Sequence, residues 1–172
     1  MNIRELEHAS IRDFLTAHET LLTGRVLDLG CGKQPYRDII ERNCRTYHPW
    51  DHVDLPASVY DGDPMSLPSG KFDAIVSTQV LQYVVDVRSW LKLRHVDLDN
   101  GAHLLLTGPT NWPIVEAEDL WRWTPAGIAT ELSRAGFQAE HIRVGVRAAV
   151  VFPGQSEKWP LGWWAVAQKE YR

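Results

Sequence analysis

The sequence has little cysteine, no long apolar run and no excess of basic residues. Its only cysteines, Cys31 and Cys44, do not provide the dense pairing of a disulfide-stabilised secreted domain. The first residues, MNIRELEHAS, carry charges where a signal peptide needs an apolar core, and no segment approaches the length of a membrane span. We therefore expect a cytoplasmic protein that does not enter a membrane.

The balance of charge argues against a nucleic-acid partner. Lysine and arginine number 18 against 22 acidic residues, and the pI is near 5.9, whereas binding to a phosphate backbone needs a concentrated basic surface. Small or neutral substrates fit this composition better. The length of 172 residues, without a Gly/Ser tract or charge block, predicts a single domain over 1–172, with a helical segment at 1–22 and a core at 23–172.

An apolar strand that leads into a glycine-rich turn is the most informative segment. It reads GRVLDLGCGKQ over residues 24–34, and a helix is expected to follow. Glycine at Gly30 and Gly32 lets the chain turn sharply and brings main-chain amides close to a bound molecule, while the helix start adds donors and partial positive charge. Two glycines alone would also fit an ordinary strand-to-helix turn that binds no ligand.

Strands and helices alternate along the chain. Apolar runs predict strands at residues 25–29, 46–50, near 59, and at 72–77, 103–107, 139–152 and 162–168. Helices are expected over 3–22 and 35–43, after the N-cap Asp86, and between Thr124-Pro125 and Gly136. Such alternation predicts an α/β protein whose parallel sheet is covered on both faces. Only a loop joins the last two strands, so we expect them to pair as an antiparallel hairpin at the sheet edge.

Three acidic residues follow successive predicted strands. Ligands of such sheets bind beyond the carboxyl ends of the strands. Asp28 lies close to the glycines, and Asp51 comes about twenty residues later, where a carboxylate accepts hydrogen bonds from ribose hydroxyls. Asp63 is placed to accept a bond from an exocyclic amine such as that of adenine. Each acid alone is more typical of a surface or loop-capping carboxylate than of a binding site, but the joint placement of the three at successive strand ends favours a nucleoside site.

These segments together resemble the class I S-adenosylmethionine (SAM)-dependent methyltransferases of small-molecule type, over about residues 22–137. The similar segments are VLDLGCGKQPY, YHPWDHVD, DGDPMSLPSGKFDAIVSTQVLQYVVD, GAHLLLTGP and WRWTPAGIATELSRAGF. The resemblance implies a Rossmann-like, seven-stranded, mostly parallel sheet with an antiparallel C-terminal edge hairpin and helices on both faces. It also implies SAM as cofactor. A nicotinamide dehydrogenase is disfavoured because its fingerprint needs glycine where Pro35 stands.

The resemblance also assigns the cofactor contacts. Gly30 and Gly32 would pack under the methionine part of SAM, Asp51 would hold the ribose, and Asp63 with Met65 would frame the adenine. The full expected set is Asp28, Gly30, Cys31, Gly32, Asp51, Asp63, Pro64, Met65, Thr78 and Gln79, of which the last two border the cofactor on the side facing the substrate.

The chain departs from the family pattern at three places, one of which is the short linker between Asp51 and Asp63, where we expect the usual helix to be missing. Gln34 replaces a third glycine often found in the turn, which is tolerable because only the two glycines nearest the cofactor have a strict steric reason. Gln82 and Tyr83 replace a frequent Glu-His pair, which puts an acid/base role there in doubt. The remaining candidates for a base are His48, His52 and Tyr83, each of which has an ordinary structural role as its alternative.

A tryptophan-rich loop is the predicted substrate wall. Aromatic rings there stack on a planar substrate or face the sulfonium of the cofactor, although core packing is the alternative for each ring. Trp163 and Trp164 are expected to pack within the fold, whereas Phe14 or His18 of the N-terminal helix is a candidate to point inward toward the cofactor. The predicted substrate contacts are Tyr83, Asn111, Trp112, Trp121 and Trp123.

The sequence therefore predicts methyl transfer from SAM to an oxygen, nitrogen or carbon of a small molecule, without a metal. Two alternatives stay open: a SAM-binding enzyme that catalyses a cyclisation or rearrangement without methyl transfer, and a non-catalytic binding subunit. The chain has no inserted cap domain. Such a site is exposed, or it is covered by a partner or a second copy of the chain.

Overall fold

The computed structural model describes residues 2–51, 67–114, 117–151 and 153–171, and within them the strands form one mixed sheet. The order across this sheet is β2-β1-β3-β4-β6-β5, with β1 to β4 parallel and β6 antiparallel to both of its neighbours. The predicted antiparallel C-terminal hairpin is thus confirmed. The strand expected near residue 59 lies outside the described residues. The six described strands are β1 (Gly24–Leu29), β2 (Cys44–Trp50), β3 (Phe72–Thr78), β4 (Leu98–Pro109), β5 (Ile142–Val151) and β6 (Lys158–Gln168).

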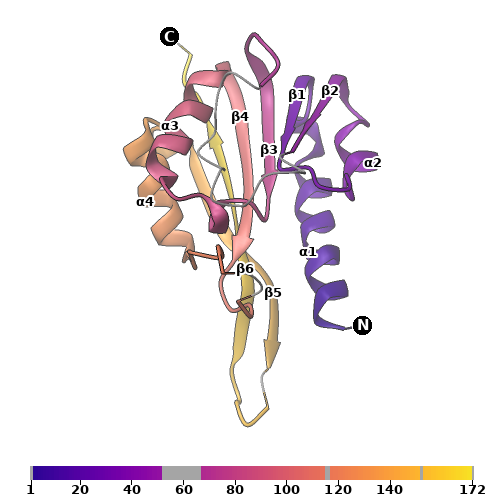
Figure 1. Ribbon diagram of the computed structural model, residues 1–172, viewed down its shortest axis with the longest axis vertical. Coiled ribbons are helices and arrows are strands. Elements are labelled where there is room, and N and C mark those ends of the chain that lie inside the picture. Colours follow the sequence, from indigo (N-terminus) through magenta and orange to yellow (C-terminus); the bar gives the residue numbers. More distant parts are fainter. Residues whose placement is uncertain (1, 52–66, 115–116, 152, 172) are drawn as a thin grey trace.

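Helices cover both faces of the sheet, as the alternation predicts (Figure 1). Successive strand residues point to opposite faces, so Val26 and Leu27 enter different cores. On one face α1 (Ile3–Ala17) and α2 (Arg37–Ile40) bury apolar side chains, and on the other α3 (Val87–Asp97) and α4 (Pro125–Ala135) do the same.

The expected helix caps are present. Asp86 accepts a hydrogen bond from Ser89 N at 3.0 Å and begins α3, and Thr124 accepts one from Gly127 N at 3.1 Å and begins α4. Gly136 ends α4. Across the described part of the chain, no helix is both long and apolar enough to span a bilayer.

Several predicted boundaries were wrong. The helix expected over 35–43 is only the single turn of α2, and β2 begins at Cys44, two residues before the predicted strand, because Cys44 pairs with Gly24 of β1. The strand β4 begins before Asn100-Gly101, since Gly101 N donates to Lys169 O and draws this segment onto the C-terminal residues. A 3-10 turn over Ala139–His141 occupies the start of the strand predicted at 139–152. The strand β6 begins at Lys158, earlier than predicted, because Lys158 pairs with Val151 of β5.

The carboxyl ends of the parallel strands face the end of the molecule from which the β5–β6 hairpin projects (Figure 1). The segments that leave these ends begin at Gly30, Asp51, Gln79 and Thr110. Chain segments far apart in the sequence therefore meet at one edge, where ligands of open α/β sheets bind.

Candidate functional site

The glycine turn is fastened to the end of β2. Gly30 N and Cys31 N both donate to Trp50 O, at 2.8 and 3.2 Å, and Gly32 N donates to the Asp51 carboxylate. The structure thus brings the turn and Asp51 together, as the sequence predicts. The Asp51 carboxylate lies directly against the main chain of the turn.

The two glycines of the turn have different steric surroundings. A Cβ on Gly30, whose φ is +79°, would lie 2.2 Å from Val80 Cγ2, so this glycine is required by protein packing. A Cβ on Gly32, whose φ is +50°, would meet only Asp51 Oδ2, at 3.8 Å, among the described residues. Gly32 therefore presents an open main-chain surface beside a carboxylate, which suits a bound nucleoside.

Gln34 adopts the backbone conformation that explains the family's preference for glycine at its position. Its φ is +56°, in the left-handed region that side chains rarely adopt. The conformation is held because Gln34 N donates to Cys31 O at 2.8 Å and Arg37 Nη1 donates to Gln34 Oε1 at 3.2 Å. These bonds allow the turn to close without a third glycine.

Asp28 lies beneath the turn and is buried. Its Oδ2 accepts a hydrogen bond from the Tyr47 hydroxyl at 2.7 Å. Burial raises the pKa of Asp28 to about 6, and the nearby Asp51 charge adds to this rise while the Tyr47 bond opposes it. Burial likewise raises the pKa of the Cys31 thiol to about 11. The Cys31 thiol therefore keeps its proton at neutral pH, whereas Asp28 gains or loses its proton near pH 6.

Protonation of Asp28 gives a testable pH dependence of stability. Because its pKa is raised in the folded state, the folded chain binds the proton more tightly than the unfolded chain, and this contribution is lost as the pH rises through about 6. We expect the free energy of unfolding of wild type, relative to Asp28→Asn, to fall by about 1.4 kcal/mol between pH 5 and pH 7.5. Urea unfolding at both pH values measures this. The exposed Asp13→Asn is the control, and a difference between wild type and Asp28→Asn that does not change with pH would contradict the assignment.

The end of β3 places a strained residue at the same edge. Thr78 is the last residue of β3, and Gln79 follows it with a φ of +58°. Gln79 N donates to Thr107 O at 3.0 Å, which fixes this backbone against β4. Uncommon backbone conformations of this kind gather at ligand sites.

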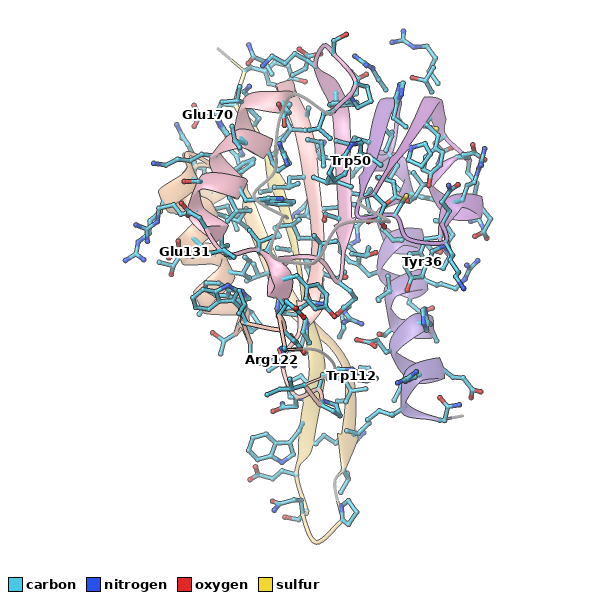
Figure 2. All side chains as sticks on the ribbon, in the orientation of Figure 1. Tyr36, Trp50, Trp112, Arg122, Glu131 and Glu170 are labelled. Carbon is cyan, nitrogen blue, oxygen red and sulfur yellow. The ribbon has the colours of Figure 1, made fainter. Side chains whose placement is uncertain are left out.

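A cavity of about 220 Å³ lies between α1 and this edge. Gln79 lines it together with the predicted substrate residues Tyr83 and Trp112. Figure 2 shows Tyr36 and Trp112 contributed by two different segments, the first before α2 and the second after β4. Five of the polar or aromatic lining residues were not predicted as site residues from the sequence: Glu7, His8, Tyr36, Gln82 and Asp119.

His8 and Tyr36 form a polar pair in this cavity. His8 Nδ1 lies 2.9 Å from the Tyr36 hydroxyl. Tyr36 is buried, and its burial raises the pKa of the phenol to about 12, so the phenol keeps its proton. The pair can therefore orient a polar ligand atom.

A buried arginine of β5 holds α1 beside the cavity. Arg147 Nη1 donates to Ser10 Oγ at 2.6 Å, and its Nε donates to Trp163 O at 3.2 Å. Its Nη2 lies 3.7 Å from Glu7 Oε1. Burial lowers the pKa of Arg147, and the carboxylate of Glu7 opposes that effect. One guanidinium thus bridges the sheet and the first helix.

Other predicted substrate residues lie outside this cavity. Asn111 Nδ2 donates to Pro160 O at 2.8 Å, and Trp121 Nε1 donates to Val84 O at 2.8 Å. The rings of Trp121 and Trp123 are 5.7 Å apart and line a separate depression that reaches Glu131. The structure therefore divides the predicted substrate wall into two parts.

The aromatic candidates of α1 point away from the site. The rings of Phe14 and His18 pack on Trp164 of β6, with centroids 5.6 and 5.5 Å away, so the prediction that either points toward the cofactor is wrong. Trp163 and Trp164 are packing residues as expected, since Trp163 is fully buried and Trp164 is half-buried under these rings.

His48, one of the predicted candidates for a base, does not line the cavity. His48 lies within β2, packs edge-on against Phe72, and accepts a bond from Arg25 Nε at 3.3 Å. Burial lowers its pKa. His52, Asp63, Pro64 and Met65 lie outside the described residues. Within the described ranges, no three His, Cys, Asp or Glu side chains gather as a metal site.

The fold is shared with solved methyltransferases. A SAM-dependent methyltransferase from Archaeoglobus fulgidus superposes with a TM-score of 0.65 at 12% identity, covering 94% of each chain. One from Mesorhizobium loti gives 0.64 at 17% identity, covering 95% of this chain and all of that one. A third structure, in which a methyltransferase is bound to the Trm112 methyltransferase activator of Haloferax volcanii, gives 0.64 at 15% identity over 98% and 95%. No curated protein matches the chain in sequence.

A parallel sheet edge with a glycine turn and an acid after the second strand defines the Rossmann-like class of cofactor-binding enzymes. The family described as "Methyltransferase domain" matches residues 3–144. The chain belongs to this family, and the prediction of a class I methyltransferase is confirmed.

Proposed function

We propose that this chain transfers a methyl group from SAM to a small molecule bound in the α1 cavity, by which we mean the 220 Å³ cavity described above. The observation that carries the proposal is the meeting of the glycine turn, Asp51 and this cavity at one sheet edge. SAM is the cofactor expected of a member of this family. The size of the cavity limits the acceptor to a small molecule, because its volume of about 220 Å³ is below the roughly 300 to 1,000 Å³ of common ligand pockets.

Residues that follow β1, β2 and β3 have the chemical groups that SAM binding needs. Gly32 offers an open main chain, Asp51 offers a carboxylate for ribose hydroxyls, and Gln79 connects this region to the α1 cavity. When bound, SAM supplies an electrophilic methyl group on a charged sulfur. The task of the chain is then to align the acceptor and exclude water, and alignment alone contributes on the order of 7 to 11 kcal/mol in favourable cases.

Calorimetric binding of SAM tests the assignment. Asp51→Ala removes the carboxylate beside Gly32, and we expect it to weaken SAM binding tenfold or more, equivalent to at least about 1.4 kcal/mol. Asp99→Ala, an exposed acid on β4, is the matched control and should bind as wild type does. Equal affinity of Asp51→Ala and wild type for SAM would show that Asp51 does not bind the cofactor.

Release of S-adenosylhomocysteine separates the proposed activity from its alternatives. Methyl transfer produces this compound together with a methylated acceptor. Substrate conversion without either product would favour a cyclisation or rearrangement, and SAM binding without any conversion would favour a binding subunit. A cytoplasmic location and a partner or second copy that covers the edge remain predictions. The Haloferax volcanii relative, which was solved with an activator, is a precedent for such a partner.

A further inference from the structure

The hairpin formed by β5 and β6 extends past the strand that supports it. The strand β4 pairs with β6 from residue 162 to residue 168, whereas β5 and β6 stay paired as far as Val151 and Lys158. We call the outer end of the hairpin, residues 149–151 and 158–160, the arm, and Figure 1 shows the hairpin projecting from the sheet. A two-stranded ribbon on its own is marginally stable in water, so the arm needs a surface to pack against.

The arm lies on an exposed and apolar strand edge. The strand β5 is the last one of the sheet, and its residues 148–151 are all alanine or valine. Val151 is 52% exposed, and Trp159 on the neighbouring strand is 41% exposed. A long edge strand presents a row of N–H and C=O groups, and edges that stay unpaired usually carry prolines, lysines or bulges. The edge of β5 therefore suits pairing with another strand.

An apolar groove lies where α1 packs beside β5, at the base of the arm. Its volume is about 330 Å³, and we call it the α1–β5 groove. Its apolar lining is Phe14, Ala17, Val146, Ala148 and Trp164, and the exposed acid Asp13 also lines it. The strand β5 runs on from this groove into the arm, so the arm of the same chain does not turn back to fill it (Figure 1). An arm can therefore occupy the groove only in another copy of the chain.

The groove and the arm lie on the same strand, on either side of Ala149. If two β5 strands pair antiparallel about a two-fold axis at Ala149, Val151 of one copy lies opposite Arg147 of the other, which lines the groove. Each arm then meets the groove of the other copy, and the contact closes on itself. A groove far from the arm, such as the depression beside Trp121, would instead join copies head to tail into a ring or a filament.

The charges of the two surfaces are complementary. Lys158 is the only charged residue of the arm, and it pairs with Val151 across the hairpin. The groove carries the exposed carboxylate of Asp13, whereas its arginine, Arg147, already faces Glu7. A lysine of one copy therefore approaches an acid of the other, which favours a second copy as the occupant. An anionic membrane surface would gain little from an arm with a single cation.

We propose that two copies of the chain form a two-fold dimer in which their β5 edges pair and the arm of each copy lies in the α1–β5 groove of the other. The dimer does not depend on methyl transfer. Ser10 of the groove is about one helical turn from Glu7 of the α1 cavity, so the second copy lies beside the proposed acceptor site.

Size-exclusion chromatography with multi-angle light scattering tests the proposal on the full chain. One copy has a mass of 19.6 kDa, and we expect wild type to elute with twice this mass. A monomer at every concentration, or an assembly larger than a dimer, would overturn the two-fold pairing. If that monomer co-sediments with phosphatidylcholine vesicles, the arm contacts a membrane instead of a second copy.

Two exposed valines provide a matched pair of variants. Val151→Lys places a charge on the arm, and we expect it to weaken dimerisation at least about tenfold. Val96→Lys changes a valine of α3 that is 55% exposed, and it should leave the dimer unchanged. Both variants should keep the circular dichroism spectrum of wild type. Equal dissociation constants of Val151→Lys and wild type in sedimentation would contradict the role of the arm.

A cysteine at the axis tests the register of the pairing. Ala149 of one copy meets Ala149 of the other, and Cα atoms of opposed residues in antiparallel strands are about 4.5 to 5.5 Å apart, within the range of a disulfide. We expect Ala149→Cys to form disulfide-linked dimers under mild oxidation and the exposed Ala139→Cys to form none. A dimer in which Ala149→Cys cross-links no more than Ala139→Cys would overturn this arrangement.

Discussion

Gly30→Val is expected to destabilise the fold by about 3 to 5 kcal/mol, while Gly32→Val is expected to fold stably and to bind SAM at least about tenfold more weakly than wild type. A valine at Gly30 would place its Cβ 2.2 Å from Val80 Cγ2, a stiff, β-branched neighbour that is 4% exposed. Overpacking and a positive φ in a β-branched residue together cost about 3 to 5 kcal/mol, a large part of the stability of a typical domain.

The same substitution at Gly32 meets open space. The positive φ costs about 1 to 2 kcal/mol, but among the described residues no heavy atom lies within 3.4 Å of the added Cβ. The branched side chain would occupy the surface that we assign to the cofactor. Thermal unfolding monitored by circular dichroism, together with SAM calorimetry, distinguishes the two variants. A Gly32→Val protein that binds SAM normally would show that the turn does not face the cofactor.

Arg147→Met is expected to destabilise the chain by about 3 to 5 kcal/mol. The guanidinium is 3% exposed and bridges Ser10, Glu7 and Trp163, so its removal leaves Glu7 buried without its cationic partner. Gly162 makes room for this arginine, because a Cβ there would lie 2.4 Å from Arg147 Nη2. Urea unfolding measures the loss.

The control for this variant is Arg143→Met, an exposed arginine on the same strand. We expect its free energy of unfolding to stay within about 0.5 kcal/mol of wild type. Ser10→Ala removes one charged hydrogen bond and should cost less, about 1.5 to 3 kcal/mol. An Arg147→Met protein as stable as the Arg143→Met control would show that the bridge does not hold α1 in place.

Features encoded by neighbouring residues were predicted well. The glycine turn, the acid that follows β2, and the caps Asp86 and Thr124 each depend on a few adjacent positions, and all are present in the structure. The limits of β4 were wrong because pairing with Lys169, almost seventy residues away, outweighed the turn signal of Asn100-Gly101. Sheet pairing of this range leaves no local pattern in the sequence.

The lining of the cavity was predicted less well, because it too depends on contacts between residues far apart in the sequence. Tyr83 and Trp112 were predicted because each follows a strand of the parallel sheet, whereas Glu7 and His8 precede the first strand and look like ordinary polar residues of an amphipathic helix. Their role depends on Arg147, which lies far along the chain. Two signals were available: Tyr36 directly follows the glycine turn, and Gln82 stands where the family pattern differs.

The bridge from Arg147 to α1 holds Glu7 and His8, which precede the first strand, in the wall of the α1 cavity. A chain that lacked residues 1–10 would keep the glycines and carboxylates of the sheet edge. It would lose Glu7 and His8, and with them most of the α1 wall of the cavity. If the α1 cavity holds the acceptor as we propose, substitutions at Glu7 or His8 should alter which acceptors bind and leave the affinity for the cofactor unchanged, so the two properties could vary separately.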